Sequence, residues 1–147
     1  MSISVSKVGH LVLRVGDLPT SLDFYEGALG LREVARRDFG EGPMVFLSSG
    51  NAHHDIALVE SAAPASRGAA LHHFALKVGD SLSELVRTRA TLEEIGVPVL
   101  MALDHRVSQG LYISDPDGNL IELYVDAPEQ LWHDDPSLVA NSEPLVM

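Results

Sequence analysis

The chain has 147 residues, no cysteine and a net charge of −11 with histidine counted as neutral. The missing cysteine excludes disulfides, zinc–thiolate sites and thiol nucleophiles, and the acidic balance argues against nucleic acid or an anionic membrane surface as a partner. Hydrophobic residues make up 46% and charged residues 21%, which is typical of one soluble globular domain. Because no long apolar run indicates a signal peptide or a membrane span, we expect a cytoplasmic protein.

The first half of the chain predicts a β-α-β-β-β unit over about residues 6–60. A run rich in Val and Leu over 8–15 indicates a buried strand, and Asp17 after it is a favourable N-cap for a helix. The segment 21–30 predicts that short helix, with Phe24 on its apolar side. Three more strands are expected to follow, over 31–39, 44–50 and 54–60.

A linker of small residues over 61–69 leads to a second unit of the same kind, over about 70–126. A strand over 71–78 precedes an amphipathic helix over 82–96. The expected apolar positions of this helix are Leu82, Leu85, Val86, Leu92 and Ile95. The unit is completed by a turn at "DPDGN" and by strands over 97–103, 111–115 and 119–125. We therefore predict one domain over 1–126 and a surface tail over 127–147, anchored by Trp132.

The two units carry the same sequence pattern at their first strands. "GHLVLRVGD" begins at Gly9 and "HHFALKVGD" at His72, so that His10 corresponds to His73. One such unit cannot close its own core, whereas two can pair and leave a cup between their sheets. The prediction is an α+β fold in which two tandem βαβββ modules form a curved, cup-shaped mixed β-sheet with the helices outside.

His10 and His73 are candidate metal ligands because each stands at the start of the first strand of its unit. A buried imidazole needs partners for both ring nitrogens, and a metal supplies one of them. Aligning the last strands of the two units places Glu122 opposite Ala57, in a strand too apolar to accept an unpaired carboxylate. His10, His73 and Glu122 make the two-His, one-carboxylate set of non-haem iron(II) sites, which leaves coordination positions open.

The duplicated unit, the two His-bearing strands and the ending "SDPDGNLIELY" resemble the vicinal oxygen chelate superfamily over roughly residues 6–126. That superfamily includes glyoxalase I, methylmalonyl-CoA epimerase, fosfomycin-resistance transferases, bleomycin-binding proteins and type I extradiol dioxygenases. The resemblance implies that the metal ligands distinguish its members. Glyoxalase I and the epimerase bring a fourth ligand from the place of Ala57, which cannot coordinate. The bleomycin-binding proteins generally lack the ligands, and the transferases need basic groups that this chain does not show.

The pattern "DHxVSxxLYxxDPDGNxIELY" is most similar to single-domain, catechol 2,3-dioxygenase-like extradiol enzymes. The resemblance implies that His54 of "HDIA" is an acid–base residue near the metal, that Tyr112 hydrogen-bonds a substrate or ligand oxygen, and that His105 assists from the preceding loop. Strand alternation places His53, not His54, on the face of Ala57, so His53 remains an alternative.

The implied function is that of an Fe(II)-dependent extradiol dioxygenase, with Mn(II) as the alternative metal. It would cleave a catechol-type ring next to the vicinal diol with O2. Its partners would be a small aromatic diol and O2, and no nucleic acid or membrane; the chain would form a homo-oligomer, a dimer or larger. Two other classes stay open: another metal-dependent isomerase, lyase or transferase of the superfamily, and a metal-free protein that sequesters an aromatic compound.

Overall fold

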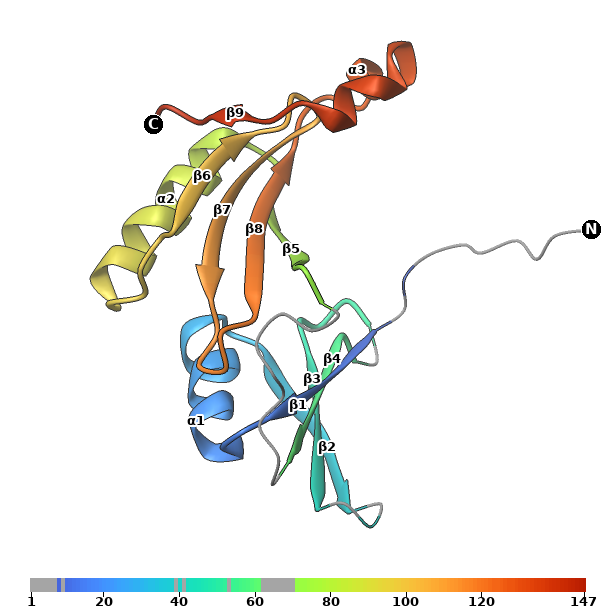
Figure 1. Cartoon of the computed structure of the whole chain (residues 1–147), viewed down its shortest axis with the longest axis vertical. Coiled ribbons are helices and arrows are strands. Elements are labelled where there is room, and N and C mark those ends of the chain that lie inside the picture. Colours follow the sequence, from blue (N-terminus) through green and yellow to red (C-terminus); the bar gives the residue numbers. More distant parts are fainter. Residues whose placement is uncertain (1–7, 9, 39, 41, 53, 62–70) are drawn as a thin grey trace, which may run out of the picture. The chain divides into compact units, whose positions relative to one another are not determined.

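The computed structural model describes residues 8, 10–38, 40, 42–52, 54–61 and 71–147, which belong to two compact units, Met1–Ser66 and Arg67–Met147. Each unit holds one small mixed sheet and few helices, which confirms the predicted α+β class (Figure 1). His53 and most of the predicted linker, from residue 62 onward, lie outside the described residues. No helix in the described part of the chain is long and apolar enough to cross a membrane.

Unit 1 is a four-stranded sheet with one helical segment. Its elements are β1 (Leu11–Val15), α1 (Leu18–Leu22), the π-helical segment η1 (Asp23–Ala28), β2 (Arg32–Asp38), β3 (Pro43–Ser48) and β4 (Ile56–Glu60). The strands lie in the order β1-β4-β3-β2, with β1 parallel to β4 and the other neighbours antiparallel. The outer strand β2 is exposed along all of its seven residues, whereas β4 is buried except at its last residue.

The helical segment of unit 1 begins earlier and turns differently than predicted. The Asp17 carboxylate accepts a hydrogen bond from the backbone N–H of Thr20 at 2.8 Å, so the predicted cap is confirmed and the helix begins directly after it. Phe24, expected on the apolar side, is half-buried, whereas the fully buried aromatic residue is Tyr25, which was not predicted. Tyr25 lies in the π-helical segment, whose wider turn spaces successive side chains differently from an α-helical turn.

Unit 2 repeats this order and adds a C-terminal extension. Its elements are β5 (Phe74–Gly79), α2 (Leu82–Glu94), β6 (Met101–Asp104), β7 (Ser108–Ser114), β8 (Leu120–Asp126), α3 (Gln130–Asp134), the 3₁₀ turn η2 (Pro136–Ala140) and β9 (Glu143–Pro144). The strand order is β5-β8-β7-β6-β9, so the predicted tail contributes an edge strand to the sheet and does more than wrap the surface. The side chain of Trp132 lies outside what the structure describes.

Helix α2 buries a narrower face than its sequence pattern predicts. Leu85 and Leu92, seven residues apart, are buried against the sheet, whereas Leu82, Val86 and Ile95 are 45%, 46% and 48% exposed. Seven residues make almost two helical turns, so the buried pair lies on one line along the helix. The other three apolar positions lie outside this narrow contact line.

The two sheets share one strand register. In unit 1, Ala57 of β4 is paired with Val12 of β1 and with Phe46 of β3. In unit 2, Glu122 of β8 is paired in the same way with Ala75 of β5 and with Tyr112 of β7. Ala57 and Glu122 therefore hold equivalent places, and the counterpart of Tyr112 is a phenylalanine.

The predicted "DPDGN" turn fixes the start of β8, just before Glu122 in the chain. The buried carboxylate of Asp115 accepts hydrogen bonds from the backbone N–H groups of Asp117 and Asn119 and from the Asn119 side chain, at 2.7–3.0 Å. Gly118 has φ of +84°, a conformation that glycine adopts without strain. The turn thus sets the β7–β8 register that brings Tyr112 opposite Glu122.

Candidate metal centre

Glu122 is a buried carboxylate that faces two histidines, His73 and His105. It is 8% exposed and lies at the middle of β8. Its Oε2 is 3.5 Å from Nε2 of His73, and its Oε1 is 3.8 Å from Nε2 of His105. Burying a carboxylate is costly unless it is paired or coordinates a metal, so this position calls for a cationic partner.

His73 presents one ring nitrogen to Glu122 and uses the other elsewhere. It lies one residue before β5, and its Nδ1 is 2.7 Å from Nδ1 of His72. Two ring nitrogens at this distance share one proton, donated by one imidazole to the other. The Nε2 of His73 is left to face Glu122. This is the arrangement of a metal-binding histidine whose second nitrogen is held by a neighbour.

Tyr112 and His105 complete the cluster in unit 2. Tyr112 is 5% exposed, and burial followed by the negative charge of Glu122 raises the pKa of its hydroxyl to about 12. The hydroxyl therefore stays protonated near neutral pH. Its oxygen lies 2.9 Å from Nε2 of His105, whose Nδ1 lies 2.8 Å from the backbone carbonyl oxygen of Asn141.

Gly110 is a site residue that the sequence analysis missed. It lies on β7, and a Cβ atom placed there would collide with the Oε1 atom of Glu122 and lie 2.9 Å from its Cγ. Only glycine therefore leaves room for the carboxylate in its present orientation. The available signal was the isolated glycine inside the strand pattern "SQGLY", since such glycines often mark a close approach.

In unit 1 the structure brings His54 together with His10 and Phe46. The ring centroids of His10 and His54 are 4.4 Å apart, and the ring of His54 meets that of Phe46 edge-on at 5.3 Å. His10 is exposed and precedes β1, while Ala57 is fully buried within β4. His54, the neighbour chosen by sequence reasoning, thus contacts the predicted ligand of its own unit.

The donor atoms of unit 2 suit a divalent metal. Nε2 of His73 and Oε2 of Glu122, 3.5 Å apart, can be bridged by two metal–ligand bonds of roughly 2.0–2.2 Å. The predicted third ligand, His10, belongs to unit 1. Within the described ranges no group of three or more His, Asp or Glu side chains is already gathered in a form that could hold a metal ion. The three-residue set therefore stays a proposal.

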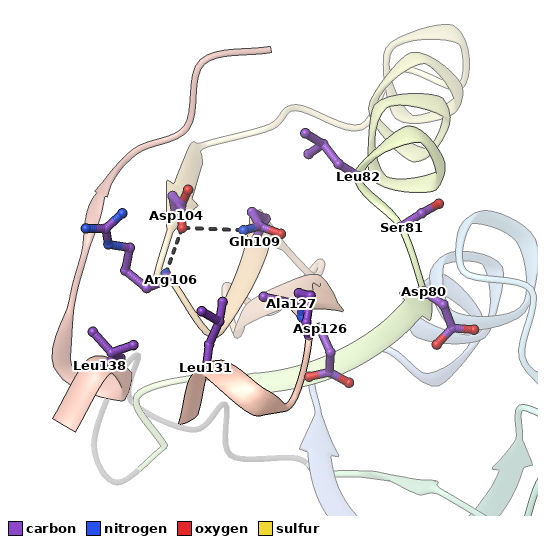
Figure 2. A pocket seen from close by; sticks show the side chains of 11 residues that line it. Asp80, Ser81, Leu82, Asp104, Arg106, Gln109, Asp126, Ala127, Leu131 and Leu138 are labelled. Atoms are coloured by element: carbon purple, nitrogen blue, oxygen red, sulfur yellow. Dashed lines mark hydrogen bonds between the residues drawn. The ribbon is translucent and has the colours of Figure 1, made fainter. Parts of the chain in front are cut away.

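A separate cavity of about 620 Å³ opens beside the loop that carries His105. Its walls come from the start of α2, from the β6–β7 hairpin and from the segments around α3 and η2, as Figure 2 shows. Asp104 and Arg106, which flank His105, both line it, and the Arg106 N–H donates to the Asp104 carboxylate at 2.7 Å. Its described lining contains no residue of the predicted site.

Comparison with known proteins identifies the family and two kinds of relative. A catechol-2,3-dioxygenase of Bacillus subtilis (strain 168) is 33% identical over 133 residues, which cover 87% of this chain and 44% of that enzyme. A lactoylglutathione lyase of Neisseria meningitidis (serogroup A, strain Z2491) is 30% identical over 124 residues, which cover 77% of this chain and 86% of the lyase. The chain therefore spans less than half the length of the dioxygenase.

A solved structure confirms the fold. The glyoxylase/bleomycin resistance protein/dioxygenase domain from Frankia sp. EAN1pec matches with a TM-score of 0.72 at 20% identity, over 84% of this chain and 100% of that domain. Residues 7–123 match the family model described as Glyoxalase/Bleomycin resistance protein/Dioxygenase superfamily. The resemblance noted from the two His-bearing strands and the "DPDGN" ending is thus confirmed, and the chain belongs to the glyoxalase/bleomycin resistance protein/dioxygenase superfamily.

Proposed function

We propose that this chain is a non-haem Fe(II) extradiol dioxygenase, with Mn(II) as the alternative metal. The ligands would be His10, His73 and Glu122. The observation that carries the proposal is the buried carboxylate of Glu122, with one histidine poised as a co-ligand at 3.5 Å and a protonated tyrosine on the paired strand. The similarity to a protein named catechol-2,3-dioxygenase supports the same choice.

The proposed metal site keeps room for substrate because unit 1 lacks a carboxylate at the matching place. Ala57 occupies the position in unit 1 that Glu122 occupies in unit 2, and a methyl side chain cannot coordinate. Bound iron would supply open coordination positions for the two oxygens of a catechol and for O2. In the overall reaction one ring C–C bond beside the diol breaks, and both atoms of O2 enter the product.

The neighbouring side chains would hold the substrate and move its proton. Tyr112, kept protonated, would donate a hydrogen bond to a substrate oxygen, and His105 would orient that hydroxyl. His54 would accept a proton from the diol and later return it, because imidazole changes charge near neutral pH. Its place beside His10 and Phe46 supports this role.

A second function to test is that of a metal-dependent lyase. The observation that favours it is the similarity to lactoylglutathione lyase, of which the chain covers 86%. The alanine at position 57 argues against it, since the resemblance implies a fourth ligand there in glyoxalase I. A metal-free binding protein is disfavoured by the same buried Glu122, which in that case would lack a cationic partner strong enough to offset its burial.

The decisive experiment is anaerobic reconstitution with Fe(II), or with Mn(II) in parallel, followed by a panel of catechols. We expect about one metal per chain, catechol-dependent oxygen uptake and a yellow ring-opened product. Glu122→Gln should lose both metal and turnover. Asp126→Asn, a control on the same strand with an exposed carboxylate, should keep both. Stoichiometric metal without oxygen uptake on any catechol would contradict the dioxygenase proposal, and turnover of a hemithioacetal would favour the lyase.

The proposed assembly and location are tested separately. We propose a homo-oligomer located in the cytoplasm, acting on a free aromatic diol with O2 and without nucleic acid or membrane. Light scattering at several protein concentrations measures the oligomer directly. A mass equal to one chain at all concentrations would contradict it, without affecting the metal assignment within one chain.

A further inference from the structure

The segment that follows η2 holds a backbone carbonyl against a side chain of the candidate site. The backbone N–H and the side-chain amide of Asn141 both donate to the carbonyl oxygen of Leu138, at 3.0 and 3.2 Å. Beyond Asn141, β9 pairs with β6, and the N–H of Leu145 donates to the carbonyl oxygen of Ala102 at 2.9 Å. Asn141 is therefore fixed from both sides, by a helical turn before it and a strand after it.

The carbonyl of Asn141 determines which ring nitrogen of His105 carries the proton. Nδ1 of His105 is 2.8 Å from that carbonyl oxygen, and Nε2 is 2.9 Å from the hydroxyl oxygen of Tyr112. A carbonyl oxygen can only accept a hydrogen bond, so Nδ1 must be the protonated nitrogen. In the neutral ring Nε2 then keeps its lone pair and can accept the hydroxyl proton of Tyr112, for which the carboxylate of Glu122 is the other acceptor.

The ring of His105 has one further charged neighbour in the described chain, Oε1 of Glu122, which lies 3.8 Å from Nε2 and so beyond hydrogen-bonding distance. The His105 side chain is 19% exposed, so water has limited access to replace a lost partner. The hairpin that carries it is tightly built: the His105 N–H donates to Ser108 at 2.9 Å, and the Val107 N–H donates to the His105 carbonyl at 2.8 Å. The backbone of His105 is thus set by the hairpin, whereas the orientation of its ring depends on Asn141 and Tyr112.

We propose that the backbone carbonyl of Asn141 is a positioning group, which fixes His105 as the Nδ1–H tautomer and aims Nε2 at Tyr112. The role in turnover rests on the proposed function, in which Tyr112 holds a substrate oxygen. The C-terminal segment that contains Asn141 thereby supports the candidate site of unit 2. Without the carbonyl, the ring is free to turn or to protonate Nε2, and Tyr112 loses its fixed acceptor.

A pair of proline variants tests the proposal in the full chain. Leu145→Pro removes the N–H that ties the segment to Ala102, which should free Asn141. Val146→Pro places the same ring one residue later, at a side chain that is 91% exposed, and is the matched control. Long-range ¹H–¹⁵N correlation spectra of histidine-labelled protein without added metal show which nitrogen carries the proton. The signals of His105 are assigned by their loss in His105→Gln.

We expect the Nδ1–H tautomer of His105 in the unaltered chain and in Val146→Pro, and a mixture of tautomers in Leu145→Pro. On a catechol substrate, Leu145→Pro should lower kcat roughly 10–100-fold, the usual range for loss of an outer partner, with KM within about twofold. An Nε2–H tautomer in the unaltered chain, or an unchanged His105 spectrum in Leu145→Pro, would overturn the proposal. The spectra need no substrate, so a failure of all chains to cleave catechols would refute the dioxygenase function alone.

Discussion

The two units of this chain have the same strand order and the same register but different polar content. In unit 1 the central positions hold Ala57 and Phe46, and in unit 2 the matching positions hold Glu122 and Tyr112. Each unit keeps one histidine at the entrance of its first strand. The comparison teaches that the two units share backbone positions, whereas a buried carboxylate and a buried hydroxyl stand in unit 2 where unit 1 has apolar side chains. The following predictions test how far this division holds.

The largest effect is expected from removing His10, the proposed metal ligand of unit 1. His10→Ala should abolish metal binding and turnover, because a two-ligand site in unit 2 would bind Fe(II) weakly. Metal content by elemental analysis after reconstitution and desalting measures this. His133→Ala, at an exposed position of α3, is the control and should bind metal normally. Full metal occupancy in His10→Ala would show that unit 1 contributes no ligand.

Restoring symmetry between the units should remove activity while keeping the metal. In Ala57→Glu a second carboxylate would reach the metal proposed to be shared and fill one position needed by the substrate. The variant should bind metal at least as well as the unaltered chain and lose catechol-dependent oxygen uptake. Ala57→Gln adds a side chain of similar volume without the charge and should not gain metal affinity. Undiminished ring cleavage in Ala57→Glu would show that position 57 does not face the metal.

A smaller loss of activity is expected from replacing His54, the proposed acid–base residue of unit 1. His54→Ala should retain metal and reduce kcat by roughly 10²–10⁴-fold, the usual contribution of a positioned proton-transfer group. Metal content and oxygen uptake are measured on the same preparation, with His133→Ala again as the control. If activity stays within about twofold, His54 has no part in proton transfer, and His53 becomes the next residue to test.

The smallest effect is expected at Gly110, where the missing side chain leaves space for the carboxylate of Glu122. Gly110→Ala should push the Glu122 side chain from its present orientation and weaken Fe(II) binding about tenfold, as loss of ligand support commonly does. Gly27→Ala is the matched control, because a Cβ atom at Gly27 meets nothing within 4 Å. Competition with a metal chelator compares the affinities. Equal affinity in the two variants would mean that the orientation of Glu122 does not matter for the metal.

The sequence predicted those parts of the fold that depend on interactions between residues close together in the chain. The Asp17 cap and the "DPDGN" turn depend on side chains that bond to nearby backbone, and both were predicted. The full burial of Tyr25 was not predicted, because a π-helical turn leaves no periodic signature in so short a segment. Helix α2 likewise shows five apolar positions in sequence, but its packing uses one line of them.

The proposed ligands of the candidate site could be selected from the sequence, whereas the residues proposed to support them could not. Duplication marks His10, His73 and Glu122, since equivalent positions can be compared within one chain. Gly110 acts through the absence of a side chain. Asn141 is proposed to act through a backbone carbonyl, which every residue possesses. Neither contribution has a side-chain type that a pattern could select, so both required the structure.

Strand β9 also has a consequence for self-association. The open edge of a sheet can recruit strands from other molecules and lead to aggregation. On its β6 side, the sheet of unit 2 is extended by β9, which pairs with Leu103 and Asp104 of β6, and the N–H of Leu145 donates to the Ala102 carbonyl oxygen. The outer strand of unit 1, "REVARRD", is not shielded in this way along its exposed residues, but it carries five charged side chains that repel an added strand. Release of β9 should therefore make the protein prone to aggregate through unit 2, even when both folded units and the metal ligands are intact.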